Sequence, residues 1–331
     1  MVEPGIIMGG SPSTGSSVLV NILNRHSALC AGPETYLFMH PKLYRDWATY
    51  APALQRRRLL NHLCSEGWFV LHGAILGNSF YQWNPQEVTA LARNSKTLAE
   101  FAACYFARAR EAQGAERWVE KSPSNVVAFP QFLDSFPQGQ VVHTVRNPLD
   151  TLASLHRRGL SAYYAAGAYL CNNSLALRCQ NHPRYIQVHY EALVDKPQET
   201  LASLLQFLGL PWENGLLETE AVEVRMEGWK NQEHGQLSNR SVGSFYELSE
   251  ETQEILLAAL HQFEFSDAFR DYHKVPLQRG EDVIKALGFT LPKVDSQRFI
   301  KTLQAQQKAD RWHRQRKLYP SGFGLYPAQL L

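Results

Sequence analysis

The sequence predicts an α/β fold in which a central parallel sheet is flanked by helices. Three segments carry this prediction, because each begins with a short apolar run and continues after a turn as a helix-like pattern: residues 5–23, 140–158 and 185–208. Strands that alternate with helices form parallel sheets covered on both faces. Ligands of such sheets bind beyond the carboxyl ends of the strands, so any site is expected in the turns that follow the apolar runs.

The first segment joins a strand to a helix through a loop rich in small hydroxyl residues. An apolar run at 5–8 leads into the loop, and apolar residues then recur at helical spacing up to Leu23. The loop has the outline GxxxxG[K][ST], with Ser16 in the place of the lysine. Glycines let backbone N–H groups converge on an anion, and a helix N-terminus adds its positive dipole end. The loop is therefore either an anion cradle or a tight turn in which a Ser or Thr caps the helix.

The second segment places an arginine and a serine where they can hold a phosphate. Arg146 closes the apolar strand 141–145, and Ser154 follows eight residues later in the predicted helix 149–158. A guanidinium fork and a hydroxyl at one sheet edge suit a phosphate group. In the alternative interpretation, Arg146 pairs with Asp150 and Ser154 bonds to its own helix.

The remaining elements complete the outline of one domain. A short strand at 118–120 precedes a Lys-Ser-Pro turn, and the strand 185–190 is followed by a helix from about Pro197 to Leu208, ended by Gly209. The stretch 36–116 is expected to be mostly helical and is rich in aromatic residues. We expect a single domain over residues 1–290 and a basic C-terminal extension over 291–331.

Composition excludes several classes of protein. The chain has 331 residues, of which 44% are apolar and 19% charged, as in globular proteins. A net charge of +2 argues against a protein that coats nucleic acid. No apolar window is long enough for a transmembrane segment and no signal peptide is evident, so a cytoplasmic protein is expected. Five cysteines without CxxC spacing predict reduced thiols, and twelve scattered histidines give no sign of a metal site.

Five motifs in order resemble the sulfotransferases that use 3'-phosphoadenosine-5'-phosphosulfate (PAPS). Besides the first loop and the Arg146–Ser154 pair, they are W-V-E-K-S-P-S-N at 118–125, H-Y-E-A-L-V-D-K-P at 189–197 leading to F-L-G-L-P-W at 207–212, and S-V-G-S-F at 241–245. The resemblance runs from about residue 5 to 250. It implies a P-loop-like sulfotransferase fold with largely helical insertions, the stretch 36–116 forming the acceptor side.

The resemblance also implies a reaction and a set of site residues. PAPS is the expected cosubstrate and adenosine 3',5'-bisphosphate (PAP) the product, with no metal required. In the family, the first loop binds the 5'-phosphosulfate and the Arg…Ser pair binds the 3'-phosphate. The residues that match the family's nucleotide-binding positions are Ser13, Thr14, Gly15, Ser16, Ser17, Arg146, Ser154, Tyr190, Ser241 and Gly243. Tyr190 resembles the family's adenine-side aromatic residue, or is simply a half-buried tyrosine.

Two departures from the family pattern bear on activity. Ser13 stands where the family usually carries Arg or Lys, and Ser244 stands where the late motif usually has Arg. Both changes remove positive charge near the phosphosulfate, unless Lys121 substitutes for it. The alternative to an active enzyme is therefore a catalytically impaired PAPS- or PAP-binding member with a regulatory or binding role. A P-loop kinase or hydrolase is a third possibility, disfavoured by the absent lysine.

Glu34 is the expected general base for in-line transfer, with Lys121 as its catalytic partner. Several branches of the family place a catalytic glutamate after the first helix, as in Gly32-Pro33-Glu34. In the competing interpretation Glu34 is an N-cap or first-turn carboxylate of a helix over residues 35–39. His40 and His143 are weaker candidates for the base, and His143 lies within an apolar strand.

The acceptor is expected to be a hydroxyl of an alcohol or phenol, on an apolar small molecule or a lipid. This expectation depends on aromatic residues in the acceptor-side stretch: Trp47, Tyr50, Trp68, Phe69, Phe80, Tyr81 and Trp83. Core packing is the other explanation for such residues.

Overall fold

A five-stranded parallel sheet forms the centre of the molecule. The computed structural model describes residues 5–51, 80–218 and 237–315. The strand order is β2-β3-β1-β4-β5, and every neighbouring pair is parallel. The strands are β1 (Ile6–Gly10), β2 (Leu29–Ala31), β3 (Arg117–Lys121), β4 (Gln140–Val145) and β5 (Tyr185–His189). The α/β fold with a parallel sheet, predicted from the sequence, is confirmed.

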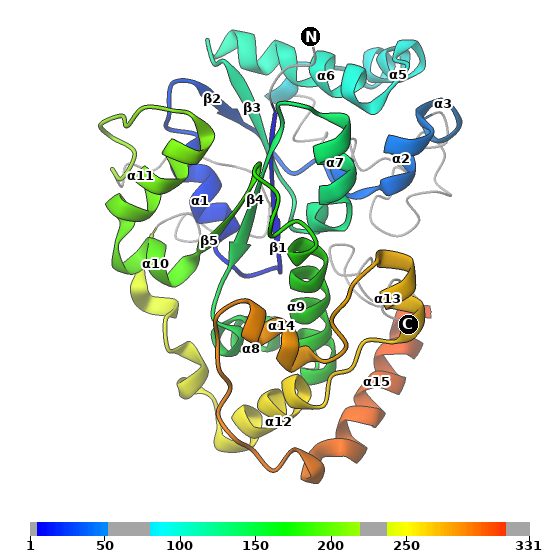
Figure 1. Ribbon diagram of the computed structural model, residues 1–331, viewed down its shortest axis with the longest axis vertical. Coiled ribbons are helices and arrows are strands. Elements are labelled where there is room, and N and C mark those ends of the chain that lie inside the picture. The colour runs from blue at the N-terminus through cyan, green and yellow to red at the C-terminus, as the bar shows by residue number, and fades with distance from the viewer. Residues whose placement is uncertain (1–4, 52–79, 219–236, 316–331) are drawn as a thin grey trace.

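The sheet is covered on both faces because its strands carry apolar residues on both sides. On β1, Ile6 and Met8 belong to one apolar cluster and Ile7 to the other. The first cluster includes apolar residues of α1 (Ser16–Leu23) and α11 (Pro197–Leu208), and α10 (Tyr190–Asp195) lies beside them (Figure 1). Helices on the other face are α6 (Leu98–Ala112), α7 (Phe129–Ser135) and α9 (Ala162–Leu177). Gly209 ends α11 with a left-handed backbone, as expected.

The described parts of the stretch 36–116 are largely helical, as expected. The elements are η1 (Leu37–Met39), α2 (Pro41–Arg45), α3 (Trp47–Tyr50), α5 (Pro85–Asn94) and α6. An aromatic stack fastens this region to the sheet: the ring of Trp118 in β3 lies 5.2 Å from that of Phe38 and 4.6 Å from that of Phe106, centroid to centroid.

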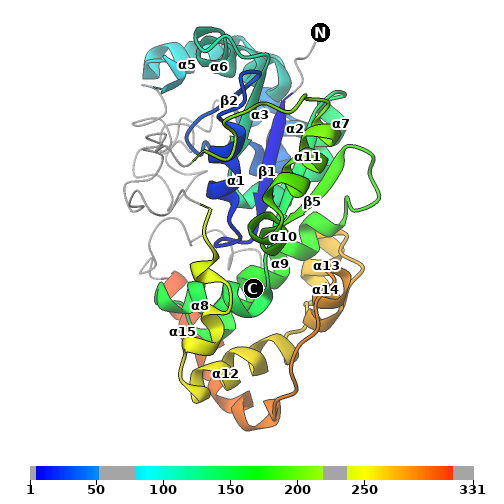
Figure 2. The same cartoon turned by 90° about the vertical axis from the view of Figure 1, so that its left-hand side faces the viewer.

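Helices that follow the sheet in the chain gather at the end opposite α5 and α6 (Figures 1 and 2). They are η5 (Asn239–Ser241), η6 (Ser244–Glu247), α12 (Glu250–His261), α13 (Asp267–His273), α14 (Gly280–Ala286), η7 (Ser296–Phe299) and α15 (Ile300–Gln315). Two further helices lie between strands in the chain: η3 (Pro123–Ala128) follows β3, and α8 (Pro148–Arg157) follows β4. The predicted C-terminal extension 291–331 includes α15, which packs against α9. Asp310 accepts a hydrogen bond from Ser161 at 2.6 Å, and Gln306 accepts one from the Tyr163 amide at 3.0 Å. Residues 316–331 lie outside the described residues.

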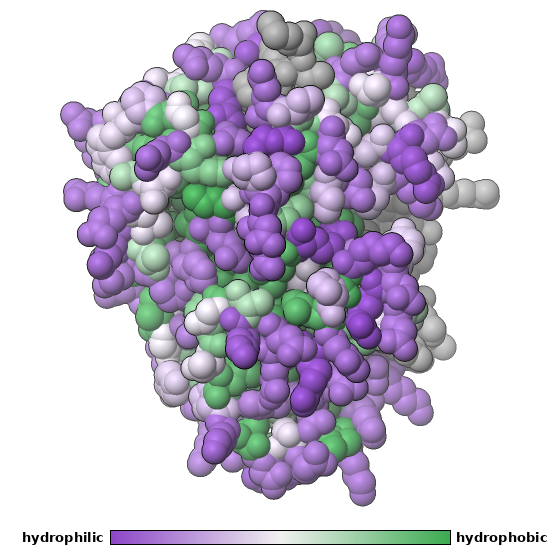
Figure 3. Space-filling view, in the orientation of Figure 1, coloured by the Kyte–Doolittle hydropathy of each residue, from purple (hydrophilic) through white to green (hydrophobic). Residues whose placement is uncertain are grey.

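Polar side chains cover most of the face seen in Figure 3, with apolar ones interspersed among them. In the part of the chain that the structure describes, no helix is both long and apolar enough to cross a membrane.

Candidate active site

All five strands contribute a predicted site residue at their carboxyl ends. The loop 11–15 follows β1, Glu34 comes three residues after β2, Lys121 ends β3, Arg146 follows β4 and Tyr190 follows β5. Because the strands are parallel, these ends lie at one edge of the sheet. Contacts described below join each of these residues to the first loop or to a neighbour that reaches it.

The first loop passes close to β4 and β5, and its glycines make that approach possible. A Cβ atom on Gly10 would lie 2.3 Å from the Thr144 carbonyl oxygen, and one on Gly15 would lie 2.3 Å from the Tyr190 ring. Gly15 also has a φ of +81°, a left-handed conformation that suits glycine. Gly15 is the N-cap of α1, and no side chain caps this helix. A Ser or Thr cap, one of the two sequence-based alternatives, is therefore wrong.

The loop hydroxyls differ in what they contact. Thr14 is buried and donates to the Ser11 carbonyl at 2.8 Å, with its oxygen 2.9 Å from the Thr144 hydroxyl. This side chain therefore braces the loop from within. Ser16 is buried in the first turn of α1, whereas Ser13 and Ser17 are only partly buried.

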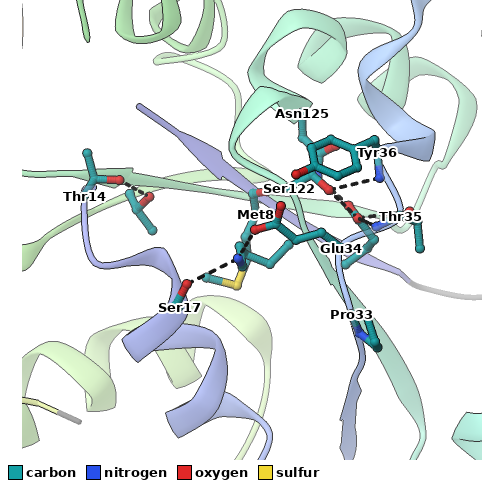
Figure 4. A network of polar contacts seen from close by, with 12 residues as sticks. Met8, Thr14, Ser17, Pro33, Glu34, Thr35, Tyr36, Ser122 and Asn125 are labelled. Carbon is teal, nitrogen blue, oxygen red and sulfur yellow. Dashed lines mark hydrogen bonds and ion pairs between the residues drawn. The ribbon is translucent and has the colours of Figure 1, made fainter. Parts of the chain in front are cut away.

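Glu34 and Lys121, the two residues expected to be catalytic, form a buried ion pair. Lys121 Nζ donates to Glu34 Oε1, and both side chains are almost fully covered. The same ammonium lies 3.3 Å from the Ser17 hydroxyl, at the start of α1 (Figure 4). Lys121 thereby joins the carboxylate that follows β2 to the loop that follows β1.

A second carboxylate, Glu120, fixes the backbone next to Glu34. It is fully buried, and its Oε1 accepts hydrogen bonds from the Thr35 amide at 2.9 Å and the Thr35 hydroxyl at 3.0 Å. Ser122 donates to the same oxygen at 2.6 Å, and Asn125 donates to the other at 2.6 Å. Ser122 in turn accepts from the Tyr36 amide at 3.1 Å (Figure 4).

Sequence reasoning missed Glu120. It occupies a variable position of the W-x-x-K stretch, so the family resemblance did not single it out. The available signal was a carboxylate inside a buried strand, because a buried charge is retained only with hydrogen-bond partners. Two of those partners, Ser122 and Asn125, lie within the same motif, whereas Thr35 is 85 residues away in the chain.

The competing role for Glu34, a carboxylate in the first turn of a helix, is wrong. The helix here is the short 3-10 turn η1, which starts at Leu37 with Tyr36 as its N-cap and has no acidic residue in its first turn. Glu34 precedes it and is free of that role.

Arg146 connects the first loop to the late segment. Its Nη1 donates to the Ser13 carbonyl at 3.1 Å, and its Nη2 donates to the Ser241 carbonyl at 2.5 Å. Its Nε is buried without a hydrogen-bond partner. Burial lowers the pKa of Arg146, and the nearby Asp150 carboxylate opposes that shift.

Asp150, the alternative partner predicted for Arg146, instead forms hydrogen bonds with the late motif. Asp150 accepts hydrogen bonds from the backbone amides of Gly243 at 2.9 Å and Phe245 at 3.0 Å. It therefore holds the late motif against the start of α8. The amide of Gly243, a residue expected to bind the nucleotide, is engaged by Asp150. Ser154 lies partly buried on α8, two turns beyond Arg146.

Tyr190 lies between the loop and the late segment. Its side chain is buried. Its hydroxyl donates to the Ser238 carbonyl at 2.7 Å and lies 3.1 Å from the Ser241 hydroxyl. The Arg146 guanidinium lies 5.1 Å from the ring centroid. The ring is thus covered by Gly15 and Arg146, and its observed role is to hold these segments together.

The two histidines considered as bases lie in different surroundings. His143 is fully buried between the Tyr185 hydroxyl at 2.7 Å and Asn173 Oδ1 at 2.9 Å, and burial lowers its pKa to about 3. It is a core histidine. His40 is the N-cap residue of α2, and burial lowers its pKa to about 4.

Aromatic residues of the acceptor-side stretch serve largely as core. Trp47 and Tyr81 are buried, and they donate to the Ala92 and Pro33 carbonyls at 3.1 and 3.0 Å. These contacts hold α3 to α5, and the helical residues Phe80 and Tyr81 to the segment that follows β2. Trp68 and Phe69 lie outside the described residues.

Comparisons with known proteins show the family and the fold of the chain. A model of the sulfotransferase family matches residues 4–214. The sulfotransferase domain of the Synechococcus PCC 7002 olefin synthase has a similar fold, with a TM-score of 0.54 and 20% identity, over 88% of this chain and 96% of that one. The sulfotransferase domain of the curacin biosynthetic pathway gives a TM-score of 0.54 and 18% identity, over 88% of this chain and all of that one.

A curated relative is also similar over part of the chain. It is an uncharacterized protein of Aquifex aeolicus (strain VF5), 29% identical over 115 residues, which are 31% of this chain and 15% of that protein. The match therefore spans only a small fraction of the relative's length.

Proposed function

Because the chain belongs to the sulfotransferase family, we propose that it moves a sulfuryl group from PAPS to a hydroxyl of an acceptor. The observation that carries this proposal is the position of Lys121, which contacts both Glu34 and Ser17, in the first turn of α1 directly after the first loop. A candidate base and a candidate anion cradle are thereby joined through one cation. Such an arrangement suits a reaction that removes a proton at one point and gathers negative charge at another.

The residues at this edge fit a nucleotide with phosphate groups. The first turn of α1 has no side-chain cap, so its backbone N–H groups are candidates to bind an anion. Arg146 is buried and has an Nε without a partner, so it retains a donor for an anion. We assign the 5' side of PAPS to the loop residues 13–17, and the 3'-phosphate to Arg146 and Ser154.

Each residue then has a stated task. When bound, PAPS supplies a sulfuryl group whose bond to the 5'-phosphate breaks as its bond to the acceptor oxygen forms, leaving PAP. Glu34 accepts the proton of the acceptor hydroxyl on its carboxylate. Lys121 holds Glu34 in place and, through its contact with Ser17, brings positive charge to the loop. Glu120 acts one step further away, as a positioning residue for the 34–36 backbone.

The acceptor in this proposal is an alcohol or phenol. The half-buried Tyr50, Phe80 and Trp83 pack against the core, and among the expected aromatic residues that the structure describes they are the ones that support an apolar acceptor. Trp47 and Tyr81 do not support it, because their rings are used in the core.

The first experiment is calorimetric titration of the purified protein with PAP, with AMP and ADP as controls. We expect micromolar binding of PAP that depends on the 3'-phosphate. Equal affinity for PAP and ADP would contradict the assignment of PAPS. Transfer from PAPS is then measured over a panel of alcohols and phenols, together with Glu34→Gln. We expect this variant to lose turnover and keep its PAP affinity, whereas wild-type turnover would remove Glu34 as the base.

The impaired-member alternative gives a distinct result. Such a protein binds PAP with the same preference but yields no sulfated product with any acceptor in the panel. It also stays inactive when Ser13→Arg restores a basic residue to the loop.

A further inference from the structure

The peptide unit that joins Arg146 to Asn147 is held from two sides by side chains. Tyr169, in α9, donates its hydroxyl to the Arg146 carbonyl at 2.8 Å. Glu191, in the first turn of α10, accepts a hydrogen bond from the Asn147 amide at 2.8 Å. Both polar groups of one peptide unit therefore have a side-chain partner, and the two partners come from different helices.

This peptide unit lies between the end of a strand and the start of a helix. The pairing of β4 with β5 ends at Val145 and His189, so Arg146 is one residue beyond the paired strand. Asn147 is the N-cap of α8, and the first backbone N–H groups of a helix have no partner within it. Side chains therefore do here what the hydrogen bonds of the sheet do along β4.

Tyr169 is well suited to fix a backbone position. Its side chain is fully buried in α9, and a buried hydroxyl is retained with a hydrogen-bond partner. That partner is the carbonyl of Arg146, the residue whose guanidinium group reaches both the first loop and the late segment. The core helix α9 is thereby tied directly to the backbone of the proposed phosphate ligand.

Glu191 brings a negative charge near Arg146 without occupying its guanidinium group. The Glu191 carboxylate bonds to the Asn147 amide, whereas the two Nη atoms of Arg146 bond to the carbonyl oxygens of Ser13 and Ser241. Burial lowers the pKa of Arg146, and the Glu191 carboxylate is one of the groups that oppose this shift. The carboxylate thus supports the cation while its hydrogen bond fixes the backbone.

The position of this backbone decides where the Arg146 side chain can reach. A guanidinium group binds a phosphate best when its planar fork meets the oxygens in a defined geometry. A ligand of this kind depends on supporting groups that hold it within a fraction of an ångström of that geometry. A shift of the peptide unit would move the Cα of Arg146 and its guanidinium group together.

We propose that Tyr169 and Glu191 are positioning residues that set the guanidinium group of Arg146 for the 3'-phosphate, by fixing the peptide unit 146–147 from α9 and α10. They act through Arg146 and are assigned no contact with the nucleotide. This inference rests on the proposed function, since it assumes that Arg146 binds the 3'-phosphate of PAP.

Calorimetry of Tyr169→Phe with PAP and AMP tests the first of these residues. The substitution removes only a hydroxyl, so PAP affinity should fall by about fivefold, as for one lost hydrogen bond, and AMP affinity should stay within about twofold. Tyr81→Phe is the matched control, because Tyr81 is also fully buried and its hydroxyl donates to a carbonyl, that of Pro33. This control should leave the ratio of PAP affinity to AMP affinity unchanged.

Two substitutions of Glu191 test the second residue and separate a hydrogen bond from a charge. Glu191→Ala removes the acceptor of the Asn147 amide and should lower PAP affinity more than AMP affinity, as Tyr169→Phe does. Glu191→Gln keeps an oxygen acceptor in that place and should retain most of the PAP affinity. Equal losses in the two variants would mean that the charge of Glu191 matters rather than its hydrogen bond, and would overturn its positioning role.

A double substitution shows whether the effect passes through Arg146. In the Arg146→Ala background, Tyr169→Phe should cause no further loss of PAP affinity, because there is no guanidinium group left to position. The same loss in both backgrounds would mean that the hydroxyl acts independently of Arg146, and the inference would be wrong. Thermal denaturation checks that each variant is folded, and if Tyr169→Phe is not, the Glu191 variants decide.

The outcomes separate this inference from the proposed function. If the wild-type protein binds PAP no better than AMP, the proposed 3'-phosphate site fails and the inference fails with it. If the wild type prefers PAP, and both Tyr169→Phe and Glu191→Ala keep the full preference, only the inference is overturned.

Discussion

The Glu120 carboxylate holds Thr35 by two hydrogen bonds, one from the backbone amide and one from the hydroxyl, both to the same oxygen. Thr35 directly follows Glu34, so a buried residue of β3 sets the position of the proposed base. Lys121, the next residue of β3, holds the Glu34 side chain itself. Two adjacent residues of one strand thus fix the backbone and the carboxylate of Glu34.

The first prediction concerns Glu120→Gln. An amide in this position turns an NH2 group toward donors from Thr35 and Ser122 or from Asn125, so buried donors face each other. We expect the free energy of unfolding to fall by about 1–3 kcal/mol, and turnover to fall while PAP affinity stays within about twofold. Urea denaturation and calorimetry measure these effects. Unchanged turnover in a folded Glu120→Gln protein would show that Thr35 does not need this anchor.

The second prediction concerns the Glu34–Lys121 pair. Lys121→Met leaves a buried carboxylate without its cation and should lower the free energy of unfolding by about 3 kcal/mol. Adding Glu34→Gln removes the stranded charge and should recover part of that loss, giving a favourable coupling energy in a double-mutant cycle. Additive effects of the two substitutions would mean that the two groups do not interact in solution.

The third prediction concerns Arg146. We expect Arg146→Ala to weaken PAP at least about tenfold more than AMP, because the proposed role of Arg146 is to bind the 3'-phosphate that AMP lacks. Arg146→Lys keeps the positive charge but lacks the planar guanidinium group, so its PAP affinity should lie between those of the wild type and Arg146→Ala. This second variant distinguishes a loss of binding from a folding defect in the alanine variant. Equal losses for PAP and AMP in calorimetry would exclude this role.

The fourth prediction concerns Gly15. In Gly15→Ala the new methyl group meets the Tyr190 ring, and the φ of +81° disfavours any side chain. The loop must shift, so we expect PAP affinity to fall by tenfold or more and the melting temperature to drop by several degrees. Gly114→Ala is a useful control, because Gly114 also has a positive φ but its Cβ would meet nothing within 4 Å. Equal effects of both substitutions would mean that the Tyr190 contact is unimportant.

The fifth prediction is a pH dependence of stability that arises from His143. Asn173 donates to the Tyr169 carbonyl, so its Oδ1 faces His143 and accepts from Nε2, while Nδ1 accepts from the Tyr185 hydroxyl. This arrangement requires the neutral ring and agrees with the pKa of about 3.

The sign follows from the two pKa values of His143. In the unfolded chain, His143 has the ordinary histidine pKa of about 6.5. Between about pH 6.5 and 3, its side chain therefore binds a proton in the unfolded chain but not in the folded protein. The free energy of unfolding therefore decreases as the pH falls through this window, by up to about 1.4 kcal/mol per pH unit. His143→Gln should make that slope shallower in urea denaturation between pH 6 and 4. An identical slope in the variant would contradict the assignment.

Most of the fold was predictable because local sequence patterns specify most of its strands and helices. The strands around β1, β4 and β5 are apolar runs, and α11 runs from Pro197 to Leu208 as expected. β2 was not predicted, because its three residues form too short a run to stand out and are paired only through β3.

The site was predictable at the level of strand ends but not of partners. We expected Arg146, Lys121 and Glu34 at the sheet edge. The structure adds their partners: Arg146 contacts Ser13, and Lys121 contacts both Ser17 and Glu34. Glu120 was not expected in this role. It holds Thr35, which is 85 residues away in the chain, and no local pattern records a contact over that separation.

The arrangement in which every strand supplies one site residue has a consequence for folding. Glu34, Lys121, Arg146 and Tyr190 become neighbours only when the strand order β2-β3-β1-β4-β5 is complete. Such contacts are non-local, and they form late relative to local helices. A partly folded chain therefore has no complete pocket, and bound nucleotide should slow hydrogen exchange across the whole sheet rather than in the first loop alone.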